Sequence, residues 1–138
     1  MDRYVVITGA SQGLGKRIAE NFSALGYPLI LVARNEELLE QLKQDLSTPV
    51  EIIPADISNQ DDIHNLHETI TNNGWDIGGL INNAGIYPYK PFLIQNWEEI
   101  SMTINLNLTG TILLTQGIIK NMLQNRGGKI INICSDVA

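Results

Sequence analysis

Short apolar runs and helical stripes of apolar residues alternate along the 138 residues of the chain. Continuous apolar, mostly β-branched runs are typical of strands covered on both faces, and they predict five strands, at 4–7, 28–33, 50–53, 77–81 and 129–134. Apolar residues at helical spacing predict helices between them, at 13–25, from a cap at Asn35 to Leu46, at 59–71 and at 96–123. Strands that alternate with helices indicate a parallel sheet with helices on both faces. We therefore expect one α/β domain over residues 1–138, a Rossmann-type doubly wound sheet with strand order 3-2-1-4-5.

Polar or glycine-rich residues follow all five predicted strands. The first strand leads into Thr8–Gly15 and the fourth into Asn82–Gly85, while the others end near Arg34, Asp56 and Ser135. The carboxyl ends of parallel strands meet at one edge of a sheet, where ligands bind beside the point at which the strand order reverses. Turns alone could explain each feature singly, but the five together predict a binding site along that edge.

The stretch Thr8-Gly9-Ala10-Ser11-Gln12-Gly13-Leu14-Gly15 predicts a phosphate-binding turn between a strand and a helix. Its glycines let the backbone turn tightly and approach a diphosphate, which would face the N–H groups and positive dipole end of the helix. A P-loop is excluded, because five residues rather than four separate Gly9 from Gly15, and Arg17 follows Lys16 where a P-loop has Ser or Thr. The spacing also differs from Gly-x-Gly-x-x-Gly, and a plain helix-opening turn remains an alternative.

Four stretches, in order, resemble motifs of the short-chain dehydrogenase/reductase family. They are the glycine loop above, Asn82-Asn83-Ala84-Gly85, Asn107-Leu108-Thr109-Gly110, and the closing Gly-Gly-Lys-Ile-Ile-Asn-Ile-Cys-Ser. The resemblance implies a nicotinamide-dependent oxidoreductase that acts on a small-molecule carbonyl or alcohol substrate. It implies that the catalytic residues present here are Ser135 and Asn107. It further implies a cofactor-binding set of Gly9, Ser11, Gln12, Gly13, Leu14, Gly15, Arg34, Asp56, Ile57, Asn83, Ala84 and Gly85.

Each role that the resemblance implies has a plainer structural alternative. Asp56 would accept a hydrogen bond from the adenine amino group, or it could be a turn residue before the next helix. The stretch Asn83–Gly85 would lie against the cofactor's ribose, whereas Asn82 or its neighbour could tie the fourth strand to adjacent elements. Ser135 would hold the substrate carbonyl and Asn107 would shape a proton relay, but they could be a loop serine and a buried, helix-bending polar residue.

Arg34 favours NADP(H) over NAD(H) as the cofactor. NAD sites place an acidic residue about 20 residues past the glycines, on the ribose 2′-hydroxyl, and this sequence has Ala33-Arg34 there. A guanidinium can bind a 2′-phosphate bidentately, whereas a carboxylate repels it. Two observations oppose this assignment: Arg34 could pair with Glu36 or Glu37, and Gln12 stands where NADP-dependent members of the family often carry a basic residue.

The tyrosine and lysine that complete the family's proton-donating site do not occur at the required spacing. None of Tyr4, Tyr27, Tyr87 and Tyr89 has a lysine four residues later, and the sequence ends at Ala138, just after Ser135. We therefore expect the chain to be the N-terminal, cofactor-binding part of such an enzyme, truncated before the last strands and inactive alone. The alternative is a non-catalytic nucleotide-binding or regulatory module that is complete at 138 residues.

Composition narrows the class of partner and the location. A net charge of −6 without a basic cluster excludes nucleic acid as an expected partner. The single cysteine, Cys134, fits a reducing compartment and is expected to be buried between the layers of the sheet. No signal peptide or apolar run of membrane-spanning length occurs, so we expect a cytoplasmic protein without a membrane partner. His64 and His67 lie one turn apart without a third ligand, so we expect surface histidines and no metal.

The predicted helix at 96–123 is apolar on almost every side. A helix of this kind needs cover all round, and the sheet can cover only one side. We therefore expect a homo-oligomer that associates through this helix, and poor solubility of the chain alone.

Overall fold

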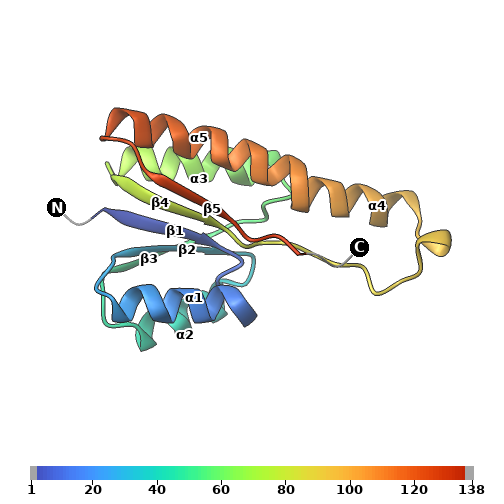
Figure 1. The fold of residues 1–138 in the computed structure, drawn as a ribbon, viewed down its shortest axis with the longest axis horizontal. Helices are drawn as coiled ribbons and strands as arrows, with labels where there is room; N and C mark the ends of the chain where they lie inside the picture. The colour runs from blue at the N-terminus through green and yellow to red at the C-terminus, as the bar shows by residue number, and fades with distance from the viewer. Residues whose placement is uncertain (1–2, 136–138) are drawn as a thin grey trace.

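The computed structural model describes residues 3–135 and confirms the predicted architecture. One parallel sheet has the strand order β3-β2-β1-β4-β5. Helices α1 and α2 cover one face of the sheet, and α3 and α5 cover the other (Figure 1). The strands are β1 Tyr4–Thr8, β2 Leu29–Ala33, β3 Val50–Pro54, β4 Ile77–Asn82 and β5 Lys129–Asn132, and the helices are α1 Gly13–Ala24, α2 Glu36–Asp45, α3 Gln60–Asn72 and α5 Thr111–Gln124.

Two apolar layers form the core, one on each face of the sheet. Successive residues of the central strands point to opposite faces, so Val6 and Ile30 pack in the layer with α3 and α5, while Ile7 and Leu31 pack in the layer with α1 and α2. All four side chains are fully buried. This two-sided burial is the reason that these strands read as continuous apolar runs.

Asparagine side chains begin the helices after β2 and β3. The Asn35 side chain accepts a hydrogen bond from the Leu38 N–H at 3.0 Å, which confirms the predicted cap of α2. Asn59 caps α3 in the same way, accepting from the Asp61 N–H at 2.8 Å, so this helix begins at Gln60, one residue later than the predicted start at 59.

The predicted single helix at 96–123 is three consecutive helical segments in the structure. These are α4 (Trp97–Ile104), a π-helical turn η2 (Asn105–Gly110) and α5. Gly110 is buried against the loop after β3, and a Cβ there would overlap the carbonyl oxygen of Ile57. Single π-helical turns frequently occur at functional sites. This turn contains Asn107, one of the two predicted catalytic residues.

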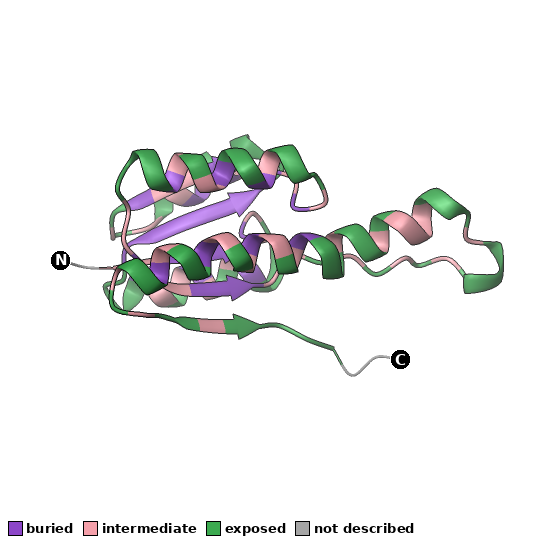
Figure 2. Cartoon of the chain, turned by 90° about the horizontal axis from the view of Figure 1, so that it is seen from above, coloured by how far each residue is buried: buried purple, intermediate pink, exposed green. Residues whose placement is uncertain are grey.

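Residues 86–104, here called the arm, extend beyond the sheet as a loop, a short 3-10 turn η1 (Phe92–Ile94) and α4 (Figure 2). No residue of α4 is buried. A bidentate contact from Lys90 Nζ to the Glu99 carboxylate, at 2.9 and 3.0 Å, connects the loop to α4. The hydrogen bond from Lys90 is the main cause that lowers the pKa of the Glu99 carboxyl, and the hydrogen bond from the backbone N–H of Asn96 lowers this pKa further. The arm therefore has defined local contacts while most of its large apolar side chains are exposed.

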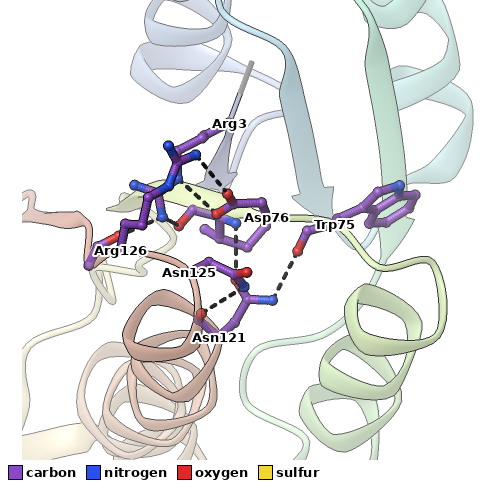
Figure 3. A network of polar contacts seen from close by, with 8 residues as sticks. Arg3, Trp75, Asp76, Asn121, Asn125 and Arg126 are labelled. Atoms are coloured by element: carbon purple, nitrogen blue, oxygen red, sulfur yellow. Dashed lines mark hydrogen bonds and ion pairs between the residues drawn. The ribbon is translucent and has the colours of Figure 1, made fainter. Parts of the chain in front are cut away.

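A polar network joins the amino-terminal ends of β1 and β4 to the end of α5, at the edge opposite the predicted site (Figure 3). Arg3 donates to the Asp76 carboxylate at 2.8 Å and to the Ile77 carbonyl at 2.7 Å, and Arg126 lies 3.7 Å from the same carboxylate. The Asn121 side chain accepts from the Ile77 N–H at 3.0 Å. The network therefore connects β1 and β4 to the end of α5.

His67 lies between α3 and α5 and is half-buried, which corrects its expected place at the surface. Its Nε2 lies 3.0 Å from the Leu114 carbonyl oxygen, and its ring packs where Gly117 leaves room. Burial, the main cause, lowers the pKa of His67, and the positive charges of His64 and Lys120 lower it further, while the hydrogen bond to Leu114 opposes them.

Candidate functional site

The glycine loop turns from β1 into α1 with a geometry that requires glycine. Gly9 and Gly13 have φ angles of +63° and +57°, in the left-handed region that favours glycine. A Cβ on Gly15 would overlap the carbonyl oxygen of Gly9, so the first turn of α1 can lie against the loop only without a side chain. The Ala10 N–H donates to the Val32 carbonyl at 3.2 Å, which holds the loop beside β2.

The first turn of α1 has no side-chain cap in the described structure. Its N-cap residue, Gln12, makes no capping hydrogen bond. Asparagines at 35, 59 and 96 cap α2, α3 and α4. The N–H groups at the start of α1 therefore have no side-chain acceptor, which is the arrangement that binds an anion at a helix N-terminus.

A cleft of about 880 Å³ lies along the carboxyl ends of β1 to β4. Its lining includes every cofactor-binding residue implied by the sequence except Leu14, which is largely exposed, and Gly15, which is buried under the loop. The lining residues are Gly9, Ser11, Gln12, Gly13, Val32, Ala33, Arg34, Asn35, Glu36, Leu38, Ala55, Asp56, Ile57, Asn83, Ala84, Gly85, Ile86 and Leu106. The structure thus brings together residues from five separate stretches, and their individual roles stay predictions.

Thr8 joins the glycine loop to the turn after β4. Its buried hydroxyl accepts hydrogen bonds from the N–H groups of Asn83 at 3.0 Å and Ala84 at 2.9 Å. In return, the Asn83 side chain donates to the Thr8 carbonyl at 3.0 Å and to the Gly9 carbonyl at 3.3 Å. No role for Thr8 beyond its place in the glycine loop was predicted. The signal available in the sequence was a threonine directly after the predicted strand at 4–7, which was expected to lie beside the fourth strand.

Asn82 and Asn83 both tie β4 to its surroundings, as the structural alternative predicted for one of them. The buried Asn82 side chain donates to the Thr115 hydroxyl at 3.0 Å and to the Asn132 side-chain oxygen at 2.8 Å. Asn82 therefore holds β4 to α5 and β5, while Asn83 faces the glycine loop and also lines the cleft.

Asn107 lies in the π-helical turn and pairs with the backbone of Ile86. Its side-chain oxygen accepts from the Ile86 N–H, and its side-chain nitrogen donates to the Ile86 carbonyl, both at 2.8 Å. The alternative of a buried polar residue is wrong, because Asn107 is exposed. Its side chain thus connects the π-helical turn to the segment that follows Gly85.

A second cleft, of about 1080 Å³, lies between α5 and β5 and contains both predicted catalytic positions, Asn107 and Ser135. Exposed Cys134 also lines it, which corrects the expectation that this cysteine is buried. β5 ends at Asn132, so Cys134 lies outside the sheet. Residues 83–86 line both clefts. A ligand in the first cleft and a ligand in the second would therefore meet at this shared turn.

Arg34 and Asp56 lie in the first cleft, after β2 and β3. Arg34 is exposed and forms no ion pair with any residue from 3 to 135, so the alternative pairing with Glu36 or Glu37 is absent from this part of the chain. Asp56 accepts from the N–H and hydroxyl of Ser58 at 2.9 and 2.7 Å, as a turn residue does. Its turn role and its place in the cleft are compatible.

The comparison with known proteins agrees with this geometry. A sequence model of the family described as short chain dehydrogenase matches residues 3–138. The chain belongs to this family. The resemblance read from the four motifs is therefore confirmed.

Two relatives are similar in sequence, and one solved structure is similar in sequence and fold. An uncharacterised oxidoreductase from Staphylococcus epidermidis is 31% identical over 97% of this chain and 58% of that protein. The 17-beta-hydroxysteroid dehydrogenase type 3 of Danio rerio is 35% identical over 100% of this chain and 47% of that protein. The structure of a short-chain dehydrogenase from Sphingobium yanoikuyae in complex with NADPH is 34% identical, with a TM-score of 0.85 over 98% of this chain and 54% of that one. The chain spans about half the length of these relatives.

Within residues 3–135, no helix is both long enough and apolar enough to cross a membrane.

Proposed function

We propose that the chain is the dinucleotide-binding part of an oxidoreductase that transfers a hydride between NADP(H) and a carbonyl or alcohol substrate. One observation carries this proposal: the cleft at the glycine loop and the cleft containing Asn107 and Ser135 share the wall at 83–86. This is the arrangement that a bound dinucleotide and a substrate need in order to meet. The chain also belongs to a family in which a solved relative is in complex with NADPH.

The residues of the first cleft fit a dinucleotide diphosphate. Gly9 and Gly13 have backbone conformations open to a close approach, and the uncapped N–H groups of α1 lie beside them. A Cβ at Gly9 would lie 2.9 Å from the Asn83 side chain, so the loop and the turn after β4 fit together only with glycine there. When bound, the dinucleotide supplies the hydride acceptor or donor. The chain binds and orients it along the ends of β1 to β4.

Arg34 supports NADP(H) rather than NAD(H) as the cofactor. Its guanidinium is exposed in the cleft and has no ion-pair partner among residues 3–135, so it is available to a 2′-phosphate. Asp56 follows the next strand, and Ser58 donates both of its hydrogen bonds to the Oδ1 atom of Asp56. The Asp56 carboxylate would therefore have acceptor sites available for the adenine amino group.

The second cleft would hold the substrate's reacting group near Ser135 and Asn107. A hydroxyl such as that of Ser135 can donate a hydrogen bond to a carbonyl and so stabilise the oxygen as negative charge develops on it. Asn107 uses its side chain to hold the Ile86 backbone, so its side chain shapes the wall shared by the two clefts.

Nucleotide titration of the chain tests the cofactor proposal. We expect NADPH to bind more tightly than NADH by fluorescence or calorimetry. Arg34→Ala should weaken NADPH binding about tenfold, the loss of one charge-assisted contact of about 1.4 kcal/mol, and leave NADH binding nearly unchanged. Arg17→Ala is the matched control, because this exposed arginine pairs with Glu20 and lies outside the cleft. Tighter binding of NADH than NADPH by the unchanged chain would contradict the proposal.

We also propose that the chain self-associates through the helical segments at 97–124. Apolar side chains at intervals of four or seven residues form an exposed stripe along them: Ile104, Leu108, Ile112, Ile119 and Leu123. Exposed apolar surface of this extent is typical of a contact between proteins.

A further inference from the structure

Glu36 lines the first cleft together with Arg34, the residue that would bind the cofactor's 2′-phosphate. It is the first residue of α2, directly after the Asn35 cap. The next residue, Glu37, has the same charge on the same helical turn but does not line the cleft. The two glutamates therefore differ in position rather than in chemistry.

The negative charge of Glu36 is uncompensated in the described structure. No lysine, arginine or histidine among residues 3–135 forms an ion pair with it, and Arg34 has no ion-pair partner there either. Both side chains are exposed. A cationic and an anionic residue thus line the same cleft without forming an ion pair with each other.

We infer that Glu36 is a specificity-determining residue that opposes the 2′-phosphate and so limits the preference for NADP(H) that Arg34 creates. This inference rests on the proposed function of the cleft. The carboxylate repels the phosphate dianion and has little effect on the uncharged 2′-hydroxyl of NAD(H). The preference between the two cofactors is therefore set by the attraction of Arg34 for the 2′-phosphate minus its repulsion by Glu36.

A second role of Glu36 has to be separated from this one. Acidic residues in the first turn of a helix stabilise it through the helix dipole, and Glu36 and Glu37 share that role in α2. Glu37→Gln removes the same charge from the same turn and is the matched control. Any effect that comes from weakening α2 appears in both variants, whereas an effect on the 2′-phosphate appears only in Glu36→Gln.

The test uses two small probes that differ in the 2′-phosphate, 2′,5′-ADP and 5′-AMP, with NADPH and NADH alongside. Calorimetric titration should show that Glu36→Gln tightens binding of 2′,5′-ADP and NADPH about threefold to fivefold, the upper range of an exposed charge interaction. Binding of 5′-AMP and NADH should stay within twofold. Glu36→Lys should increase the gain further, and raising the salt concentration should reduce it, because salt screens exposed charges.

The outcomes separate this inference from the proposed function. An equal change in Glu36→Gln and Glu37→Gln, or an equal change for both probes, overturns the specificity role and leaves the proposed function standing. Loss of 2′,5′-ADP binding in Glu36→Gln, with the far-ultraviolet circular dichroism unchanged, reverses the sign and also overturns the role. Failure of the unchanged chain to bind any of the four nucleotides overturns the proposed function, and the inference with it.

Discussion

Replacing Thr8 by valine tests whether its hydroxyl holds the two halves of the first cleft together. Valine keeps the shape of threonine and removes the hydroxyl, which accepts from the Asn83 and Ala84 N–H groups at 3.0 and 2.9 Å and donates to the Ile81 carbonyl at 3.4 Å. The hydroxyl itself is buried, with the residue 1% exposed. The substitution therefore leaves two backbone donors without their partner and adds no volume.

The magnitude follows from those two donors. A buried donor that loses its partner costs about 1–3 kcal/mol, and water reaches the half-buried turn in part, so we expect Thr8→Val to lower the free energy of unfolding by about 2–4 kcal/mol. With an unfolding entropy of about 2.1 cal/mol/K per residue, a chain of 138 residues should lose roughly 7–14 °C in Tm.

Urea denaturation and thermal melting measure this loss, and Thr8→Ser is the matched control. Serine keeps the hydroxyl and removes one methyl group, which costs about 1 kcal/mol. We also expect Thr8→Val to weaken NADPH binding, because the hydroxyl connects the glycine loop to the turn at 83–86. If the valine and serine variants unfold at the same urea concentration, the hydroxyl does not satisfy these donors and the reasoning fails.

The remaining predictions concern pH and self-association. Because the pKa of His67 is lowered in the folded chain, the unfolded chain takes up the proton first, and stability should fall as pH drops below about 6.5, towards the folded-state value. His67→Gln should flatten the dependence of Tm on pH between 7 and 5 relative to the exposed control His64→Gln, and equal slopes would contradict a role for His67. Light scattering at micromolar concentrations should show an oligomer that Ile104→Glu dissociates and the exposed control Gln124→Glu does not; a monomeric unchanged chain would refute self-association.

The order of the strands could be predicted because few arrangements satisfy both the apolar pattern and the handedness of the connections. The run Leu29–Ala33 is buried on both faces, which requires helices above and below. Right-handed crossovers then allow few topologies, and the glycine loop after the first strand indicates where the order reverses. The apolar pattern of the strands and the handedness of their connections favour the same strand order, so the sequence alone was sufficient to predict it.

The helix at 96–123 shows why the sequence was insufficient elsewhere. An α-helical and a π-helical turn of six residues present similar apolar patterns, and the turn at Asn105–Gly110 is accompanied by a contact between Gly110 and Ile57, far apart in the sequence. Periodicity records the neighbours of a residue along its own helix and contains no information about such a distant contact. The same limit applies to Cys134, whose burial would have required the fifth strand to continue past Asn132.

The motifs that were recognised separately in the sequence act together as a frame around the first cleft. The Asn83 side chain binds the glycine loop, and the Asn107 side chain holds the Ile86 backbone three residues further on. Gly110, at the end of the same π-helical turn, lies against Ile57 in the loop after β3, which also lines the cleft. Four segments are therefore connected one after another around the cleft: the glycine loop, the turn after β4, the π-helical turn and the loop after β3. Because each connection joins residues distant in the chain, the shape of the cleft depends on the whole sheet, and a nucleotide would find its contacts largely preformed.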